Sequence, residues 1–115
     1  MQKKLRIGII EDEVLIAENI TMHLEDMGHV IVGVAGSFDD AISQIKRVTP
    51  DLLLVDIRLR GERSGIKIAK ELSENYKIPF LFLTSNTDRA TIKQAMECFP
   101  LAYIRKPFSF EDLFI

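Results

Sequence analysis

The stretch LLLVDIRL, residues 52–59, joins a run of apolar, strand-forming side chains to one carboxylate, Asp56. The run shows no alternation of polar and apolar residues, which is typical of a parallel strand covered on both faces. An ionised carboxylate is costly in apolar surroundings unless a partner compensates its charge. The pattern therefore predicts a buried central strand whose end presents Asp56 to a polar site.

Apolar runs alternate with helical patterns along the rest of the chain. We expect strands at 5–10, 30–35, 52–55, 79–83 and 101–104, and helices at 13–27, 37–48, 66–72 and 88–96, with another beginning at 109. This order predicts an α/β fold with a doubly wound, five-stranded parallel sheet and helices on both faces. Residues 109–115 provide only about two helical turns. We therefore expect a truncated fifth helix, and a domain that is the N-terminal part of a longer chain.

The composition is that of one globular domain, with 115 residues of which 47% are hydrophobic and 28% charged. A net charge of -2 argues against nucleic-acid contact by this domain. The single cysteine, Cys98, excludes an internal disulfide and suits a reducing compartment. The short apolar run near the N-terminus meets acidic residues at once and fits neither a signal peptide nor a membrane span. We expect a cytoplasmic protein that does not enter a membrane.

Polar side chains gather where the predicted strands end, which is where open parallel sheets bind ligands. These positions carry Glu11, Asp12 and Glu13 after the first strand, Asp56 after the third, Thr84 and Ser85 after the fourth, and Arg105 and Lys106 after the fifth. Converging carboxylates raise one another's pKa values, and Mg²⁺ removes that conflict. Lys106 can neutralise a phosphoryl group, and the Thr84 hydroxyl can donate to one. Together these residues support phosphoryl transfer onto a carboxylate.

Each of these features also has a purely structural interpretation. Acidic residues after a strand often begin a helix, whose dipole favours them. A threonine at a strand end is commonly a cap, and Asp56 alone can form a turn. Their joint placement at consecutive strand ends favours the functional interpretation. His23 and His29 lack the spacing of a metal site, so we expect them to be solvated or to cap a helix.

Four motifs occur in order and in register along the chain: IIEDE at 9–13, LLLVDIRL at 52–59, LFLTS at 81–85 and YIRKPF at 103–108. As a set they resemble the receiver domain of two-component response regulators, over nearly all of residues 1–115. The resemblance implies the flavodoxin-like strand order 2-1-3-4-5. It also implies a domain that is not an enzyme acting on a separate substrate. Such a domain accepts a phosphoryl group from a sensor histidine kinase or a phosphotransfer protein, and later loses it.

The resemblance assigns roles to individual residues. Asp56 is the expected phosphoacceptor, and Thr84 and Lys106 are expected to contact the phosphoryl group. The expected Mg²⁺ ligands are Asp12 directly, Glu11 through water, Asp56, and the backbone carbonyl of Arg58. Thr84 and Tyr103 are the expected switch, which remodels the surface of the fourth helix, fifth strand and fifth helix. The Lys106–Pro107 peptide bond is expected to be cis.

The chain departs from the family pattern at two places: in the loop that follows Asp56, and in the stretch just before the fifth strand. The first loop lacks the Met-Pro pair common in the family, and Gly65 falls one residue later than usual. The sequence FPLAY stands where Gly-Ala is frequent, so we expect Pro100 to close the preceding helix. Positions that tune the lifetime of the phosphoryl group are occupied by Arg58, Ser85 and Asn86.

Other functional classes fit the sequence less well. A haloacid-dehalogenase-type phosphatase needs a second aspartate where Arg58 stands, and a dinucleotide-binding domain needs a glycine-rich motif in place of 11–13. The remaining alternative is a pseudo-receiver that is not phosphorylated and serves as a protein-interaction scaffold, although such domains usually lose an acid or the lysine. For a phosphorylated receiver we expect control of transcription through a C-terminal DNA-binding domain. Homodimerisation through the switch surface is a further expectation.

Overall fold

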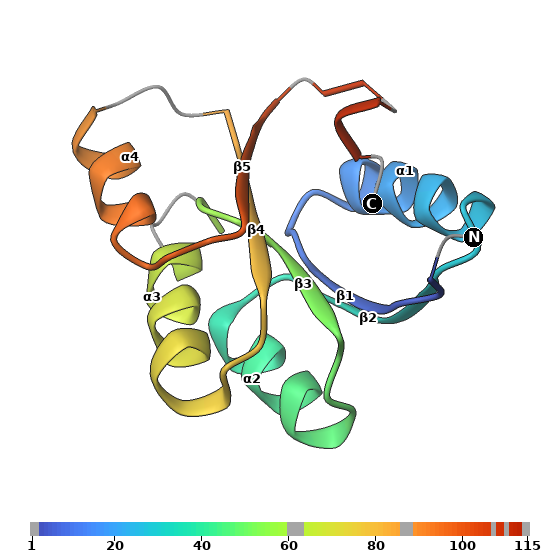
Figure 1. Cartoon of the computed structure of the whole chain (residues 1–115), viewed down its shortest axis with the longest axis horizontal. Helices are drawn as coiled ribbons and strands as arrows, with labels where there is room; N and C mark the ends of the chain where they lie inside the picture. The colour runs from blue at the N-terminus through green and yellow to red at the C-terminus, as the bar shows by residue number, and fades with distance from the viewer. Residues whose placement is uncertain (1–2, 60–63, 86–88, 107, 110, 114–115) are drawn as a thin grey trace.

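The computed structural model describes residues 3–59, 64–85, 89–106, 108–109 and 111–113 (Figure 1). The strands are β1 (Arg6–Ile10), β2 (Val30–Ala35), β3 (Leu52–Asp56), β4 (Phe80–Thr84) and β5 (Ala102–Arg105). The α-helices of the described residues are α1 (Val14–Asp26), α2 (Phe38–Arg47), α3 (Ser64–Glu71) and α4 (Arg89–Met96). Every strand boundary lies within one residue of its predicted position.

The five strands pair in parallel in the order β2-β1-β3-β4-β5, which confirms the predicted topology. β3 lies at the centre, with Leu54 opposite Ile9 of β1 and opposite Leu81 of β4. All residues of β3 and β4 are buried. The unbroken apolar run of β3 follows from this position, because both of its faces are covered.

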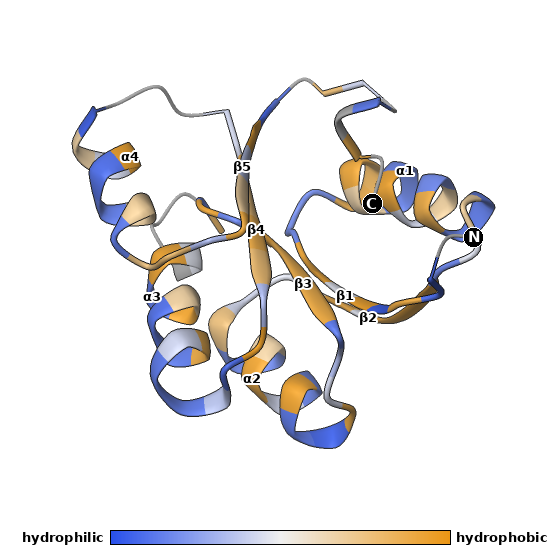
Figure 2. Cartoon of the chain, in the orientation of Figure 1, coloured by the Kyte–Doolittle hydropathy of each residue, from blue (hydrophilic) through white to orange (hydrophobic). Residues whose placement is uncertain are grey.

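Helices cover both faces of the sheet (Figure 1). On one face α1 contributes Ala17, Ile20 and Leu24 to the core. On the other face α2, α3 and α4 contribute Ala41, Ile45, Ile66, Ile68, Ala69 and Ala95. Figure 2 shows mainly hydrophobic residues along the strands, whereas the helices carry both hydrophobic and hydrophilic residues. The sheet thus separates two apolar clusters, as the predicted doubly wound fold requires.

The last described residues form a short helical turn at the position of the predicted fifth helix. Glu111–Leu113 is a 3-10 turn. Leu113 is buried in the cluster that α1 contributes to, and Phe108 packs against that cluster. The expectation of a truncated fifth helix is therefore confirmed.

Two helix ends differ from the prediction. α3 continues through a π-helical turn, Leu72–Tyr76, and Lys77 ends it with a φ of 54°. α4 ends at Met96, so Pro100 does not close it. Phe99 makes the reversal instead, with a φ of 59° in the left-handed region. Glycine is the usual residue at such a position because it has no Cβ. A phenylalanine in its place is not a recognisable turn signal, so the turn was not predicted.

The prediction of a solvated or capping role for His29 is wrong. The side chain is buried, with 4% of its surface exposed, and its Nδ1 accepts a hydrogen bond of 3.0 Å from the backbone N–H of Leu5. This bond joins the residue before β1 to the turn between α1 and β2. The partner lies 24 residues away in the chain, so no local pattern could indicate it.

Candidate functional site

The carboxyl ends of four strands bring the predicted functional side chains together. Glu11 follows β1, Asp56 ends β3, Thr84 ends β4 and Lys106 follows β5. β3 lies between β1 and β4 in the sheet, so the Asp56 side chain stands in the middle of this group. Glu11, Asp56 and Thr84 are all buried. Buried polar groups at adjoining strand ends form a polar site at the edge of an apolar core.

Three carboxylates form the acidic part of the site. Oxygen atoms of Glu11, Asp12 and Asp56 all lie within 4.8 Å of one another. Asp12 is half-buried, whereas the other two are buried. Mg²⁺ takes carboxylate oxygens and retains several waters, which suits a cluster with one partly exposed member. The donor set of these residues therefore fits Mg²⁺, and they can hold such an ion.

Lys106 supplies the positive charge of the site. Its Nζ lies 2.6 Å from Glu11 Oε1 and 3.0 Å from Asp56 Oδ2, and it donates a hydrogen bond to each. The lysine side chain is largely buried, and the two carboxylate side chains are buried more completely. A charged hydrogen bond in such surroundings is stronger than one in water. One ammonium group thus links two carboxylates from different strands.

The crowding of charges shifts the protonation equilibria. Burial raises the pKa of Glu11 to about 7, and the neighbouring Asp56 carboxylate adds to this effect while Lys106 opposes it. Burial alone lowers the pKa of Lys106, but its hydrogen bonds to Glu11 and Asp56 outweigh burial, so its pKa is raised. Lys106 therefore stays charged at neutral pH. With a pKa of about 7, the Glu11 carboxyl changes its charge near neutral pH.

Backbone N–H groups also donate hydrogen bonds to the two buried carboxylates. These bonds were not predicted from the sequence. The N–H of Arg58 donates to Asp56 Oδ1 at 3.1 Å, and the N–H of Glu13 donates to Glu11 Oε2 at 3.2 Å. Each donor lies two residues after its acceptor, a spacing at which aspartate side chains often form local turns. These bonds orient both carboxylates before any ligand binds.

The expected switch residues lie close to this site in the sheet. Thr84 is buried, and its carbonyl accepts a hydrogen bond of 2.7 Å from the N–H of Lys106. Tyr103 lies on β5 opposite Phe82 of β4; it is half-buried and packs against the cluster formed with α2, α3 and α4. Ser85 is exposed and, together with Lys106, lines a hollow of about 400 Å³. Arg58 is exposed, and Asn86 and Pro107, including the expected cis bond, lie outside the described residues.

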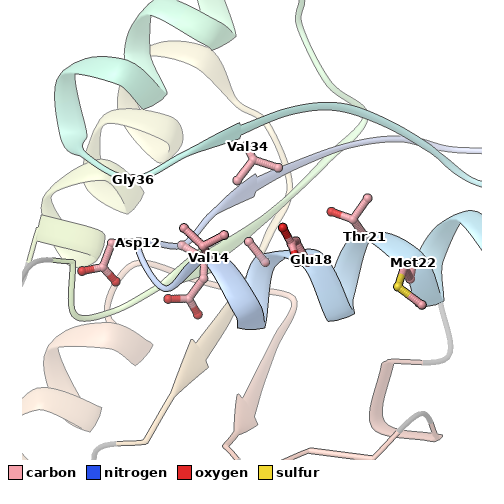
Figure 3. A pocket seen from close by; sticks show the side chains of 9 residues that line it. Asp12, Val14, Glu18, Thr21, Met22, Val34 and Gly36 are labelled. Carbon is pink, nitrogen blue, oxygen red and sulfur yellow. The ribbon is translucent and has the colours of Figure 1, made fainter.

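A second hollow, of about 620 Å³, adjoins the acidic cluster (Figure 3). Glu11 and Asp12 are among its lining residues, and its apolar lining includes Val14 and Met22 of α1 and Val34 of β2. These three apolar side chains are exposed. The site therefore opens beside an apolar surface.

The sequence was compared with models of known protein families in order to interpret the site. The family model described as the response regulator receiver domain matches residues 7–115. The chain belongs to this family. The match thus extends over almost all of the chain, including each strand end of the site. Among the residues that the structure describes, every helix is too short or too polar to span a lipid bilayer.

Curated relatives and solved structures agree with this membership. The receiver domain is 34% identical over 108 residues to the transcriptional regulatory protein PdtaR of Mycobacterium tuberculosis, covering 94% of this chain and 52% of the relative. It is 36% identical over 105 residues to the phyllosphere-induced regulator PhyR of Methylorubrum extorquens, covering 89% of this chain and 38% of the relative. The chain therefore spans about half or less of the length of these relatives.

Among solved structures, the receiver domain is similar to the signal receiver domain of a modulated diguanylate cyclase from Desulfovibrio desulfuricans. The TM-score is 0.88 at 31% identity, over 96% of this chain and 88% of that one. The response regulator PhyR from Brucella abortus matches with a TM-score of 0.82 at 31% identity, over 97% of this chain and 45% of that one. One of these proteins is a diguanylate cyclase and the other a response regulator, so the similarity concerns the receiver domain that they share.

Proposed function

We propose that this receiver domain accepts a phosphoryl group on Asp56 and thereby controls an output. The observation that carries the proposal is the Lys106 ammonium, which lies 3.0 Å from Asp56 Oδ2 beside two further carboxylates. Phosphoryl transfer depends chiefly on positioning and on charge neutralisation. The arrangement supplies both, because backbone and side-chain hydrogen bonds hold the carboxylate from two sides.

The proposed step forms one bond and breaks one. A carboxylate oxygen of Asp56 attacks the phosphorus of a phosphohistidine on a sensor histidine kinase or a phosphotransfer protein. The phosphorus–nitrogen bond breaks, and the histidine leaves with the bonding electron pair, which takes up a proton. Asp56 then carries an acyl phosphate, and Lys106 faces its charge. Water later hydrolyses this bond, so the domain itself is modified and does not turn over a separate substrate.

Glu11, Asp12, Asp56 and the backbone carbonyl of Arg58 are the residues that would hold Mg²⁺. The first three are supported by the mutual distances of their oxygen atoms. When bound, the ion supplies positive charge that offsets the charge on the phosphoryl oxygens. The carboxylates and Lys106 orient the reacting group without it, as their hydrogen bonds indicate.

We further propose that Thr84 and Tyr103 carry the signal to the surface of α4 and β5. Thr84 would donate its hydroxyl proton to a phosphoryl oxygen, and Tyr103 would turn toward the space near β4. The half-buried position of Tyr103 supports this role, because an aromatic ring in that position can adopt either an inward or an outward rotamer. Arg58, Ser85 and Asn86 would set how long the phosphoryl group persists.

The partners follow from two exposed apolar surfaces. The exposed side chains of Val14 and Met22 on α1 line the hollow that adjoins the acidic site, and they suit docking of the phosphodonor protein. Met96, Phe99 and Leu101, which are also exposed, lie at the end of α4 and before β5 and suit a homodimer through that side. A C-terminal DNA-binding domain in the cytoplasm is the output we propose, and the similarity to one relative, the DNA-binding response regulator MtrA of Mycobacterium tuberculosis, supports it.

The proposal is tested by incubating the protein with Mg²⁺ and a small phosphodonor such as acetyl phosphate. Intact-protein mass spectrometry should show the mass gain of one phosphoryl group in the wild type and none in Asp56→Asn. Asparagine keeps the shape of the side chain and its oxygen acceptor for Arg58, so the variant is a matched control for folding. A wild type that gains nothing supports the scaffold alternative, and a variant that gains as much as the wild type refutes the role of Asp56.

A further inference from the structure

Gly65 lies in the first turn of α3 with its Cα directed at the backbone of the strand that carries Asp56. A Cβ atom at this position would overlap with the carbonyl oxygen of Asp56, and it would lie 2.7 Å from Ile57 Cα and 2.8 Å from the Asp56 carbonyl carbon. Real Cβ atoms essentially never approach other atoms within 3.0 Å. Because the neighbours are backbone atoms, they cannot move away by rotating a side chain. Any residue other than glycine must displace the backbone of Asp56 or that of α3.

The same backbone segment is held from both sides. The N–H of Gly65 donates to the Ile57 carbonyl at 3.1 Å, while the N–H of Ile57 donates to the Leu83 carbonyl of β4 at 3.0 Å. The next N–H, that of Arg58, donates to Asp56 Oδ1. The peptide groups around Asp56 are therefore held between β4 and α3. The hydrogen bond from α3 requires the close approach of Gly65 to this backbone.

We propose that Gly65 is a positioning residue for Asp56: by lacking a side chain, it lets α3 hold the phosphoacceptor backbone at the place where the carboxylate meets Lys106. This inference rests on the proposed function and adds to it a residue that acts through the backbone of Asp56 and not through its carboxylate. A displacement of about 1 Å in a reacting group can lower a rate about a hundredfold. Gly65→Ala should therefore lower the maximal rate of phosphorylation by about that factor.

Gly8→Ala is the matched control. Gly8 is a buried glycine of β1, and a Cβ there would meet the side-chain atom Leu53 Cδ2 at 2.6 Å. This substitution also adds a methyl group to a tight place, but it contacts a side chain and not the backbone of Asp56. It should cost stability while leaving the phosphorylation rate of the folded protein within about threefold of the wild type.

The experiment measures three quantities for the wild type and both variants. Urea unfolding gives the folded fraction, and mass spectrometry with acetyl phosphate and Mg²⁺ gives the rate per folded molecule. Nuclear magnetic resonance gives the chemical shift of the Arg58 amide, which reports its hydrogen bond to Asp56. We expect Gly65→Ala alone to react about a hundredfold more slowly and to shift the Arg58 resonance. A variant that is partly unfolded is assayed in trimethylamine oxide, which favours the compact state.

Each other outcome has a defined meaning. Equal rates per folded molecule for the two variants overturn the positioning role. A Gly65→Ala protein that stays unfolded in the osmolyte also overturns it, because Gly65 then serves the fold as a whole. A wild type that accepts no phosphoryl group refutes the proposed function instead. In that case the Arg58 resonance decides the positioning role: a shift confined to Gly65→Ala supports it, and an unchanged shift rejects it.

Discussion

Lys106 Nζ lies 3.0 Å from Asp56 Oδ2, although the two residues are 50 positions apart in the chain. The pairing depends on the order of the strands, because β5 reaches the site from the far side of β4. The same ammonium lies 2.6 Å from Glu11 Oε1 and so joins the ends of β1, β3 and β5. The consequences of this contact for stability and metal binding can be measured.

Lys106→Met should weaken the fold and strengthen the binding of Mg²⁺. The substitution leaves buried carboxylate oxygens without a donor, which typically costs about 1–3 kcal/mol of unfolding free energy. It also removes a positive charge near the metal site, so we expect Mg²⁺ to bind about tenfold more tightly. Urea unfolding and isothermal titration calorimetry measure the two effects. Lys46→Met, an exposed change on α2, should alter neither, and an unchanged Mg²⁺ affinity in Lys106→Met would contradict the prediction.

Glu11 should make the stability of the Mg²⁺-free protein fall as the pH rises through its titration range. The folded protein holds the Glu11 proton more tightly than the unfolded chain, because burial raises the pKa from 4.5 to about 7. This contribution is fully present below pH 4.5 and is lost as the pH rises through 7.

The measurement compares urea unfolding of the wild type and of Glu11→Gln at about pH 5 and about pH 8. Glutamine does not titrate, so the variant should lose less stability than the wild type over this interval. Excess Mg²⁺ should reduce the loss in the wild type, because the ion stabilises the ionised carboxylate. Identical slopes for both proteins would show that Glu11 does not titrate in this range.

Thr84→Val should separate phosphorylation from its effect on Tyr103. Valine has nearly the same shape as threonine but has no hydroxyl to donate to a phosphoryl oxygen. The variant should still gain the phosphoryl group, while the amide resonance of Tyr103 moves less on phosphorylation than in the wild type. Thr49→Val, at an exposed threonine after α2, is the control and should respond as the wild type does. If the Tyr103 resonance of Thr84→Val moved as far on phosphorylation as that of the wild type, Thr84 would have no part in the switch.

Phe99→Gly should stabilise the domain. Phe99 has a φ of 59°, and 85% of its surface is exposed, so the ring contributes little packing in the isolated domain. A left-handed conformation costs a residue with a Cβ about 1–2 kcal/mol, whereas glycine adopts it freely. After allowing for the greater freedom of glycine in the unfolded chain, we expect a net gain of about 0.5–1 kcal/mol.

Urea unfolding tests the gain, and analytical ultracentrifugation of the same variant tests the proposed homodimer. Removal of the exposed ring should weaken self-association if α4 and β5 form the interface. Met22→Ala, on α1, removes an exposed apolar side chain from the opposite side of the sheet and should leave association unchanged. A less stable Phe99→Gly protein would show that the ring has contacts that offset the strain.

The sequence by itself determined the order of strands and helices and the residues at the strand ends. Hydrophobic periodicity is a local property, so the buried run before Asp56 and the helical spacing in 13–27 could be recognised without a structure. The acids after β1, the Thr84 that ends β4 and Lys106 after β5 were predicted as one site because parallel strands present their carboxyl ends at the same edge.

Tertiary structure alone decided which of those groups touch and how tightly they are held. The bridge from Lys106 to two carboxylates, the buried hydrogen bond of His29 and the contact between Gly65 and Asp56 all join residues that come together only after the sheet forms. Their distances depend on strand register and on backbone approach within a few tenths of an ångström. Local sequence patterns carry no such information. They indicate whether a residue lies on the buried or the exposed face of its helix or strand, and not which atoms of other elements it contacts.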